Sequence, residues 1–515
     1  MSRTRLYHRL QHLLSRASPA TAPRAITRRS AVALLAAAAS CSPKRPSTEP
    51  RSESIGIIGA GASGLVAAWR LANAGLSCEI FEASGRVGGR IYTLRDFTPT
   101  GQFCELGGEF VSSTDKALID LCAELGISLQ PVRSGLANDR YDIGGVLRSP
   151  RDLMDMEGGT GAFVSIAERI AADQAALLDD KGGWTARARD LDALPLSKYL
   201  ASLSPSTENW VIDLIALAYR TEFGLPVDRQ SSLNLIDSIG AQETGSFAMF
   251  GDQDEMLRIA GGAATLPEAI AERLQSQPLA ERVGIQLRHR LVAISRDALG
   301  FRLVFADETG KLIERSFKRL ALALPFTALR EIKGLGGLGL STAKMQAINK
   351  LGYGAISKLA VATVGPLRDA MAPALDGRLW SDRGFQCVWD GGITQSREGG
   401  VLINIFGGAA AMGEETAALH TLQTGLEALA PELASTLIPN LRASFFWPRH
   451  PYTKGSRATC LPGQYTSLLE HAAAPELDGR VMFAGEHTSP EHHGSMNGAV
   501  AAGERAAREL LAINS

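Results

Sequence analysis

A glycine-rich stretch near the start, SIGIIGAGASGLVAAWRLANAGLSCEIFEAS, constrains the fold more than any other part of this 515-residue chain. The apolar run from Ile55 to Ile58 predicts a buried strand, and apolar residues at helical period follow the glycines. The letters CEIFEA predict a second strand after Gly75. The stretch is therefore expected to form a strand–helix–strand unit.

The glycines of this unit have the G-x-G-x-x-G spacing of a dinucleotide site. Gly59 permits a tight turn, Gly61 lets the backbone approach a pyrophosphate, and Gly64 lets the helix pack against the strand. The helix N-terminus offers unpaired N–H groups to the phosphates. Glu82 follows about 20 residues on, where a carboxylate accepts hydrogen bonds from a ribose diol and repels a 2′-phosphate. We therefore predict dinucleotide binding and disfavour NADP; the alternative is an ordinary turn between strand and helix.

A second glycine- and arginine-rich segment, GRVGGRIYTL, follows directly. A guanidinium from Arg86 or Arg90 can neutralise phosphate. A cofactor that continues past its pyrophosphate would need such a segment, whereas a simple NAD dehydrogenase would not. The alternative is a basic surface turn.

The rest of the chain alternates between strand and helix signals. Residues 152–217 read mostly as helices, IQLRHRLVAISRD and FRLVFAD as a hairpin, and RLALAL as a buried strand. A chain of 515 residues exceeds what one core usually supports. We expect a mixed α/β fold, with a Rossmann-type nucleotide-binding domain interleaved with a second domain that contains a mixed sheet and a helical part.

The first 53 residues differ from the remainder. They are rich in arginine, with no acidic residue before Glu49, and they contain TRRSAVALLAAAASC. This pattern is typical of an export signal of the twin-arginine type, with a lipoprotein-like cleavage site at Cys41. The predicted location is the periplasm or cell envelope, with a lipid anchor left open. The alternatives are a disordered basic leader or a mitochondrial presequence.

Net charge and hydropathy give no indication of nucleic-acid binding or of a membrane-spanning helix. The net charge of -1 does not favour nucleic acid. No apolar run reaches the roughly 18 residues of a membrane span.

Four segments together resemble the flavin-containing amine oxidases, the family of monoamine, polyamine and L-amino-acid oxidases. They are IIGAGASGL with Glu82, GRVGGR with CELGGEFV, RIAGGAATLPEAIAERL with RHRLVAI, and FAGEHTSPEHHGSMNGAV. The resemblance spans roughly residues 54–511. It implies noncovalent FAD, because the family's covalent cysteine falls at Ser456.

The resemblance also implies a site. Lys358 matches the family lysine that holds a water near flavin N5, and Leu291 stands where a valine usually contacts adenine. Glu486 would bind the ribityl and pyrophosphate region, and the backbone at Met496 would face the flavin pyrimidine. The expected cofactor-binding residues are Gly59, Gly61, Ala62, Ser63, Gly64, Glu82, Ala83, Arg86, Gly89, Arg90, Gly107, Gly108, Glu109, Leu291, Gly485, Glu486, Ser495 and Met496.

The implied reaction is oxidation of a primary amine or an L-amino acid, with hydride transfer to flavin N5. The imine hydrolyses to a carbonyl and ammonia, and O2 becomes H2O2. The alternatives are a polyamine or diamine oxidase, a desaturase or porphyrinogen oxidase, and a flavin-bearing scaffold without activity. The sequence leaves the oligomeric state open, with a homodimer as one arrangement.

The chain departs from the family pattern where substrate is expected. Ser495 and Arg457 stand where monoamine oxidases have the two tyrosines of an aromatic cage. Arg457 can grip a carboxylate, and Glu109 can pair with a substrate ammonium. The carboxylate-binding arginine of animal L-amino-acid oxidases maps to Phe110. The alternative is that Arg457 and Glu109 pair with other residues of the chain.

The C-terminal segment GEHTSPEHH crowds three of the 9 histidines together. No partner cluster lies elsewhere at metal-ligand spacing, so we expect no metal site. The resemblance places His492 and His493 on the approach to the flavin ring, in contact with substrate or facing solvent.

The sequence predicts a discontinuous domain arrangement. Residues 54–115, 255–332 and 455–515 are assigned to the FAD-binding domain, and residues 116–254 and 333–454 to the substrate domain, with its helical part at about 150–250.

Overall fold

The computed structural model describes residues 54–132, 139–156, 159–203, 208–241, 247–248, 254–370, 377–395 and 398–513. The predicted export signal and Cys41 lie outside these residues.

A five-stranded parallel sheet forms the base of the nucleotide-binding part, in the order β12-β2-β1-β16-β22. Its strands are β1 (Ile55–Ile58), β2 (Cys78–Phe81), β12 (Val283–Gln286), β16 (Arg319–Leu322) and β22 (Val481–Phe483). Both β1 and β16 are buried along their whole length, as the unbroken apolar runs predict. Helix α2 (Ala62–Asn73) connects β1 to β2, so the predicted strand–helix–strand unit is present.

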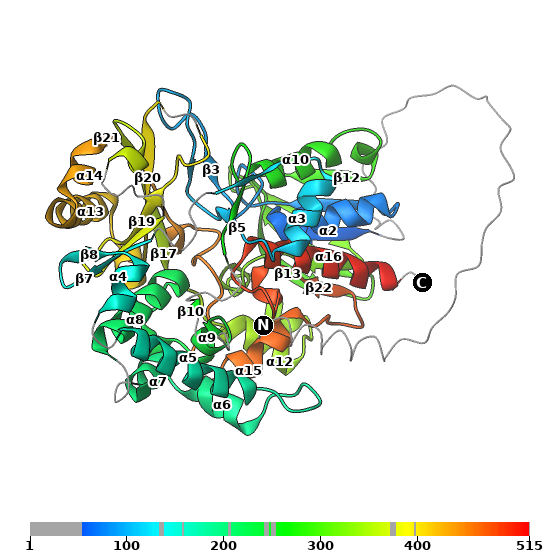
Figure 1. Ribbon diagram of the computed structural model, residues 1–515. Coiled ribbons are helices and arrows are strands. Elements are labelled where there is room, and N and C mark those ends of the chain that lie inside the picture. The colour runs from blue at the N-terminus through cyan, green and yellow to red at the C-terminus, as the bar shows by residue number, and fades with distance from the viewer. Residues whose placement is uncertain are drawn as a thin grey trace, which may run out of the picture.

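Helices cover this sheet. Helix α2 packs against α16 (Met496–Ala512) and α10 (Thr265–Leu274), and Figure 1 shows the first and last helices of the described chain side by side. Gly503 permits the close approach, because a Cβ there would lie 2.4 Å from the carbonyl oxygen of Ser63. The C-terminal helix is thus part of the same layer as the N-terminal one.

A second, seven-stranded sheet has the order β21-β17-β20-β19-β18-β7-β8 and lies at the opposite side of the molecule (Figure 1). Its pairs are antiparallel except β18 with β7. The strands are β7 (Arg140–Ile143), β8 (Val146–Arg148), β17 (Ile356–Thr363), β18 (Arg378–Ser381), β19 (Gln386–Asp390), β20 (Gly400–Gly407) and β21 (Leu437–Phe446). Helices α13 (Glu415–Leu429) and α14 (Pro431–Thr436) lie beside it.

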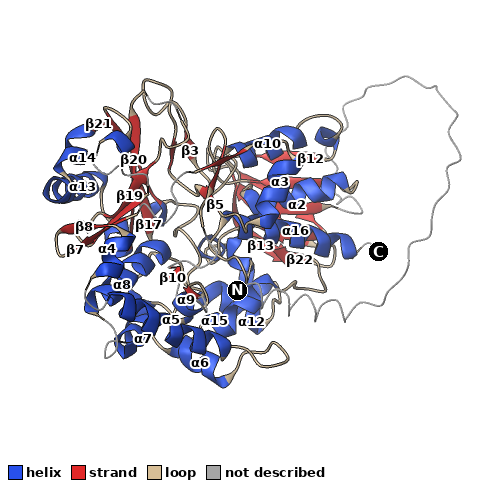
Figure 2. Ribbon diagram, viewed as in Figure 1, coloured by secondary structure: helices blue, strands red, loops and turns tan. Residues whose placement is uncertain are grey.

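A helical block lies in the range predicted for the helical part, about 150–250. Its helices gather at one end of the molecule (Figure 2). Its helices are α4 (Pro150–Asp155), α5 (Gly159–Ala175), α6 (Ala186–Ala193), α7 (Leu196–Leu203), α8 (Asn209–Phe223) and α9 (Leu233–Ile236). The remaining α-helices are α3 (Lys116–Glu124), α11 (Phe326–Leu329), α12 (Thr342–Lys350) and α15 (Tyr465–Ala473).

Short 3-10 helices connect several of these elements. They are η3 (Val227–Arg229), η4 (Leu279–Glu281), η5 (Leu335–Gly337), η6 (Leu367–Asp369), η7 (Gly408–Met412), η8 (Trp447–Arg449) and η9 (Glu486–Thr488).

Smaller sheets complete the fold. In one of them the predicted hairpin is present, but its first strand begins later than the sequence predicts. The hairpin pairs β13 (Arg290–Arg296) with β14 (Phe301–Ala306), whereas Ile285 and Gln286 belong to β12 in the parallel sheet. The reason is a break at Arg288, whose φ of 60° turns the chain between the two sheets. The other short strands are β3 (Thr93–Leu94), β4 (Cys104–Glu105), β5 (Phe110–Val111), β6 (Leu129–Pro131), β9 (Gly240–Ala241), β10 (Phe247–Ala248), β11 (Leu257–Ile259) and β15 (Leu312–Phe317).

The strands of the two large sheets fall inside the residue ranges assigned to the two domains. The domain boundaries themselves stay a prediction. Across the described ranges, every helix is too short or too polar to span a bilayer.

Candidate active site

A cavity of about 560 Å³ lies between the two large sheets. Its lining begins at the turn after β1, passes the start of α16, and reaches β17, β18 and β19. The structure brings the predicted cofactor and substrate residues together here, with Gly64 the exception.

The glycine turn explains that exception. Gly59 has a φ of 107°, which side chains rarely permit. A Cβ on Gly64 would lie 2.0 Å from the carbonyl oxygen of Gly59, so Gly64 serves helix packing and does not face the cavity. A Cβ on Gly61 would meet no protein atom within 4 Å, which leaves open space beside the N-terminus of α2. This division of roles follows the pattern that the sequence predicts.

Glu82 lies at the end of β2, beside this turn. Its carboxylate accepts hydrogen bonds from the backbone N–H of Ala60 at 2.8 Å and of Ser84 at 2.8 Å. These bonds fix the carboxylate at the cavity wall, which Ala83 and Leu291 also line. The position suits the predicted ribose contact.

The two arginines of GRVGGR have different surroundings. Arg86 donates to the backbone carbonyls of Val87, Ile91 and Gly89 at 3.0, 3.0 and 2.7 Å, which ties the loop together. Burial lowers the pKa of Arg86 below its ordinary value. Arg86 therefore shapes the loop, because its donors are directed to the carbonyls of that loop.

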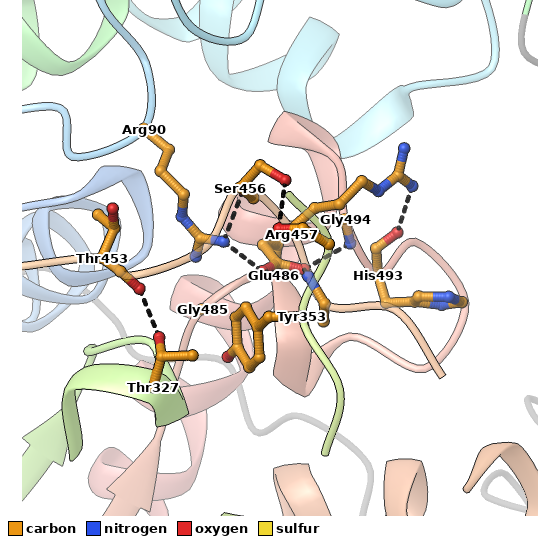
Figure 3. A network of polar contacts seen from close by, with 12 residues as sticks. Arg90, Thr327, Tyr353, Thr453, Ser456, Arg457, Gly485, Glu486, His493 and Gly494 are labelled. Atoms are coloured by element: carbon orange, nitrogen blue, oxygen red, sulfur yellow. Dashed lines mark hydrogen bonds and ion pairs between the residues drawn. The ribbon is translucent and has the colours of Figure 1, made fainter. Parts of the chain in front are cut away.

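Arg90 reaches the C-terminal segment instead (Figure 3). Its guanidinium donates to Glu486 at 2.6 Å, and Glu486 also accepts from the N–H of Gly494 at 2.6 Å. Burial alone would raise the pKa of Glu486, but Arg90, His487 and Arg457 together outweigh it, and the pKa lies below the ordinary value. This buried ion pair joins the first and last segments of the predicted cofactor site.

Ser495 has a structural role at the start of α16. It is the N-cap residue, and its hydroxyl accepts from the N–H of Gly498 at 2.9 Å. The next residue, Met496, packs closely on Gly108, where a Cβ would lie 2.9 Å from its side chain. A tyrosine in place of Ser495 would lack the short hydroxyl that makes this cap.

Lys358 lies in β17, all of whose residues are buried. Its ammonium donates to Glu109 at 2.7 Å, and Arg258 lies 3.2 Å from the other oxygen of that carboxylate. Trp389 donates to Glu109 at 2.9 Å. Burial would raise the pKa of Glu109, but Lys358 and Arg258 outweigh it and hold the pKa below its ordinary value.

The arrangement bears on two predicted roles. Lys358 is buried with a partner, as the cost of burying an unpaired charge requires. Glu109 already has two cationic partners in the chain, which matches the alternative to ammonium binding. The catalytic role of Lys358 stays a prediction.

Arg457 also has a partner in the chain. It forms an ion pair with Glu222 at the end of α8, and it lies 4.9 Å from the ring centre of Phe223. It also donates to the carbonyl of His493 at 3.4 Å (Figure 3). Both Arg457 and Glu222 line the cavity, so the pair is accessible to a ligand.

A further ion pair, Arg378 with Glu255, lies in the cavity wall and was missed by sequence reasoning. Arg378 is the first residue of β18, and its guanidinium lies 5.6 Å from the ring centre of Phe110. The predicted substrate residue Phe110 therefore contacts a cation that comes from a distant strand. No local motif marks Arg378 or Glu255, because the fold alone brings them together.

The histidine cluster is dispersed by the fold. His487 is 1% exposed, contacts the ring of Phe326 at 4.4 Å, and has a pKa lowered to about 3 by burial. His493 is buried against Tyr465, which corrects the expectation that it faces substrate or solvent. In the part of the chain that the structure describes, no group of His, Cys, Asp or Glu is placed to hold a metal ion.

The residues present fit FAD. The N-terminus of α2 has no side-chain cap, and open space lies at Gly61, where a pyrophosphate would accept from the backbone. The start of α16 faces the same cavity, where a helix N-terminus stabilises negative charge. Glu82 and Leu291 would hold the adenosine part, and Lys358 and Glu109 also line the cavity.

Comparison with known proteins agrees with this geometry. An L-amino acid dehydrogenase of Synechocystis sp. is 24% identical over 89% of this chain and 94% of its own length. Human lysine-specific histone demethylase 2 is 25% identical over 90% of this chain, which spans about half (54%) of that relative.

A solved structure shows the same fold. It is cyclohexylamine oxidase from Brevibacterium oxydans, with a TM-score of 0.74 and 21% identity over 90% of this chain and 100% of that one. The sequence model of the family described as flavin-containing amine oxidoreductase matches residues 62–511 of this chain. The chain therefore belongs to the flavin-containing amine oxidoreductase family, and it is an FAD-dependent amine oxidase.

Proposed function

We propose that the protein oxidises a primary amine or an L-amino acid, and that its cavity favours the L-amino acid. The observation that carries the choice is the pair of guanidinium–carboxylate contacts in the cavity wall, Arg378 with Glu255 and Arg457 with Glu222. An amino acid carries both a carboxylate and an ammonium group. It can therefore separate such an ion pair and bind the guanidinium with one group and the carboxylate with the other. A monoamine that opens the pair leaves a guanidinium without an anion, which is costly in a buried site.

The remaining wall residues suit the reactive form of the substrate. Trp380, Trp389 and Ile405 give the cavity an apolar surface. An apolar surface disfavours the protonated amine, and the neutral amine is the form that loses hydride from its carbon. Imine hydrolysis then yields a carbonyl product and ammonia.

FAD bound here supplies a two-electron acceptor at N5 and passes its electrons to O2, which gives H2O2. The protein positions the amine-bearing carbon and excludes water. We assign Lys358 to the flavin end of the cavity, where its cation, held by Glu109 at 2.7 Å, can order a water molecule.

Anaerobic reduction of the bound flavin tests the proposal. The purified holoenzyme is mixed with a panel of L-amino acids, their decarboxylated amines, and the diamine putrescine. We expect an L-amino acid to bleach the flavin fastest, with its D-enantiomer as the control, and admission of O2 to produce peroxide.

Three outcomes would contradict parts of the proposal. Faster bleaching by a monoamine or diamine than by every L-amino acid would overturn the substrate class. Bleaching without rapid reoxidation by O2 would make the enzyme a dehydrogenase. No bleaching by any compound of the panel would remove the proposed activity.

A further inference from the structure

Arg378 presents its guanidinium to the cavity from within an aromatic frame. The rings of Trp389, Phe110 and Trp380 have their centres 5.4, 5.6 and 5.8 Å from the guanidinium carbon. Such rings stabilise a cation and restrict its position. The side chain is only 15% exposed, yet it lines the cavity, so its accessible part faces the site.

The hydrogen bonds of this guanidinium are incomplete. Among the described residues, Glu255 is the side-chain acceptor for it, through Nη2. The neighbouring carboxylate of Asp139 accepts from the backbone N–H of Arg378 at 2.8 Å and from Trp380 at 3.2 Å. An arginine has five N–H donors in a fork that matches a carboxylate, so donors remain for a ligand.

Glu255 is held less firmly than its partner. Its side chain is 36% exposed and lines the cavity, and its backbone has a φ of 49°, a conformation that non-glycine residues rarely adopt. Burial raises the pKa of this carboxylate above its ordinary value, with Arg378 acting in the opposite direction. When a ligand carboxylate takes the place of Glu255 on Arg378, burial favours uptake of a proton by Glu255, so that no unpaired charge is left behind.

The other ion pairs near the site are different. Arg258 and Lys358 hold Glu109 in a cluster of mutual ion pairs, where the side-chain exposure of Arg258, Lys358 and Glu109 is 2%, 8% and 2%. Arg457 has a backbone carbonyl as a second acceptor. Arg378, in contrast, lines the cavity and has the single carboxylate of Glu255 as its side-chain acceptor among the described residues.

We propose that Arg378 anchors the carboxylate of the substrate, and that Glu255 is an internal carboxylate that occupies this anchor until substrate replaces it. The inference rests on the proposed function, since it names the residue that would recognise an amino acid. Binding would exchange an internal ion pair for one with the ligand, and the aromatic frame would keep the guanidinium in place.

Two measurements test the anchor. The first is the ratio of kcat/KM for the best L-amino acid to that for its decarboxylated amine. Arg378→Gln should lower this ratio roughly 10- to 100-fold, mainly through KM, because it removes charged hydrogen bonds. The second is titration of the oxidised flavin spectrum with benzoate, an unreactive carboxylate, whose Kd should rise by a similar factor.

Arg383→Gln is the matched control. Arg383 follows the same strand and pairs with Asp142 at 2.9 Å, but it does not line the cavity. An Arg378→Gln variant with the ratio and benzoate Kd of Arg383→Gln would overturn the proposal. The proposal would also be overturned if this kcat/KM ratio fell in Arg457→Gln and not in Arg378→Gln, because Arg457 would then be the anchor.

Glu255→Gln gives an independent arm if Arg378→Gln fails to fold. Removal of the internal competitor should lower the Kd for benzoate several-fold, and an unchanged or higher Kd would refute the exchange. Benzoate binding does not require turnover. An enzyme that binds benzoate through Arg378 yet oxidises no amine or amino acid would separate failure of the proposed function from failure of the anchor.

Discussion

The buried cluster around Glu109 gives the sharpest stability prediction. Lys358→Met removes one of its two cations but leaves Arg258 at 3.2 Å and the Trp389 donor at 2.9 Å. The loss is then that of a charge-assisted hydrogen bond, about 1.5–3 kcal/mol. Glu109→Gln instead leaves two buried cations with no anion between them, which should cost about 3–5 kcal/mol.

Thermal release of the flavin, followed by its fluorescence at a fixed FAD concentration, gives the assay. Lys454→Met is the control, because its ion pair with Glu331 is exposed and should contribute at most about 1 kcal/mol. We expect midpoints to fall in the order Lys454→Met, Lys358→Met, Glu109→Gln. If Lys358→Met is as damaging as Glu109→Gln, or as harmless as the control, the charge balance described for this cluster is wrong.

Three further predictions concern the flavin, pH and the glycine turn. Lys358→Met should slow flavin reduction or its reoxidation in stopped-flow experiments, and unchanged rates in both would remove this lysine from the reaction. Burial lowers the pKa of Lys344 from 10.5 to about 7. Between these values the unfolded chain binds more protons, so stability rises with pH across this window. Lys344→Met should therefore stabilise the protein by a few kcal/mol more at pH 6 than at pH 10 in urea denaturation, and equal gains would contradict the assignment. Gly64→Ala should destabilise the protein by about 1–3 kcal/mol through overpacking, whereas Gly61→Ala should fold normally but retain less FAD; equal behaviour in both assays would refute their separate roles.

Local patterns predicted the geometry of the glycine turn, while the roles of individual residues toward FAD stay a prediction. The roles of Gly59 and Gly64 depend on spacing within one turn, and the structure gives each the backbone contact that the spacing requires. The buried strand with Lys358 was visible for the same reason, because a single lysine interrupts an apolar run. A turn and a buried strand of this kind can be inferred from residues that are neighbours in the sequence.

The substrate end could not be predicted in the same way. Arg378 and Glu255 are more than a hundred positions apart in the chain, and neither belongs to a recognisable motif. Ser495 was predicted as a cofactor and substrate residue, which stays a prediction; its hydroxyl also caps a helix, a role that the sequence pattern did not reveal. Three-dimensional pairing decides these roles, and one sequence does not contain that information.

The parallel sheet has a consequence for the order of biosynthesis. Its edge strand β22 and the adjoining α16 come from the last part of the chain, and α16 packs directly on α2 from the first described part. The ribosome must therefore finish nearly the whole polypeptide before the nucleotide cradle can close. We therefore expect the cofactor to bind only after synthesis is nearly complete, and a nascent chain stalled before residue 481 should carry no flavin.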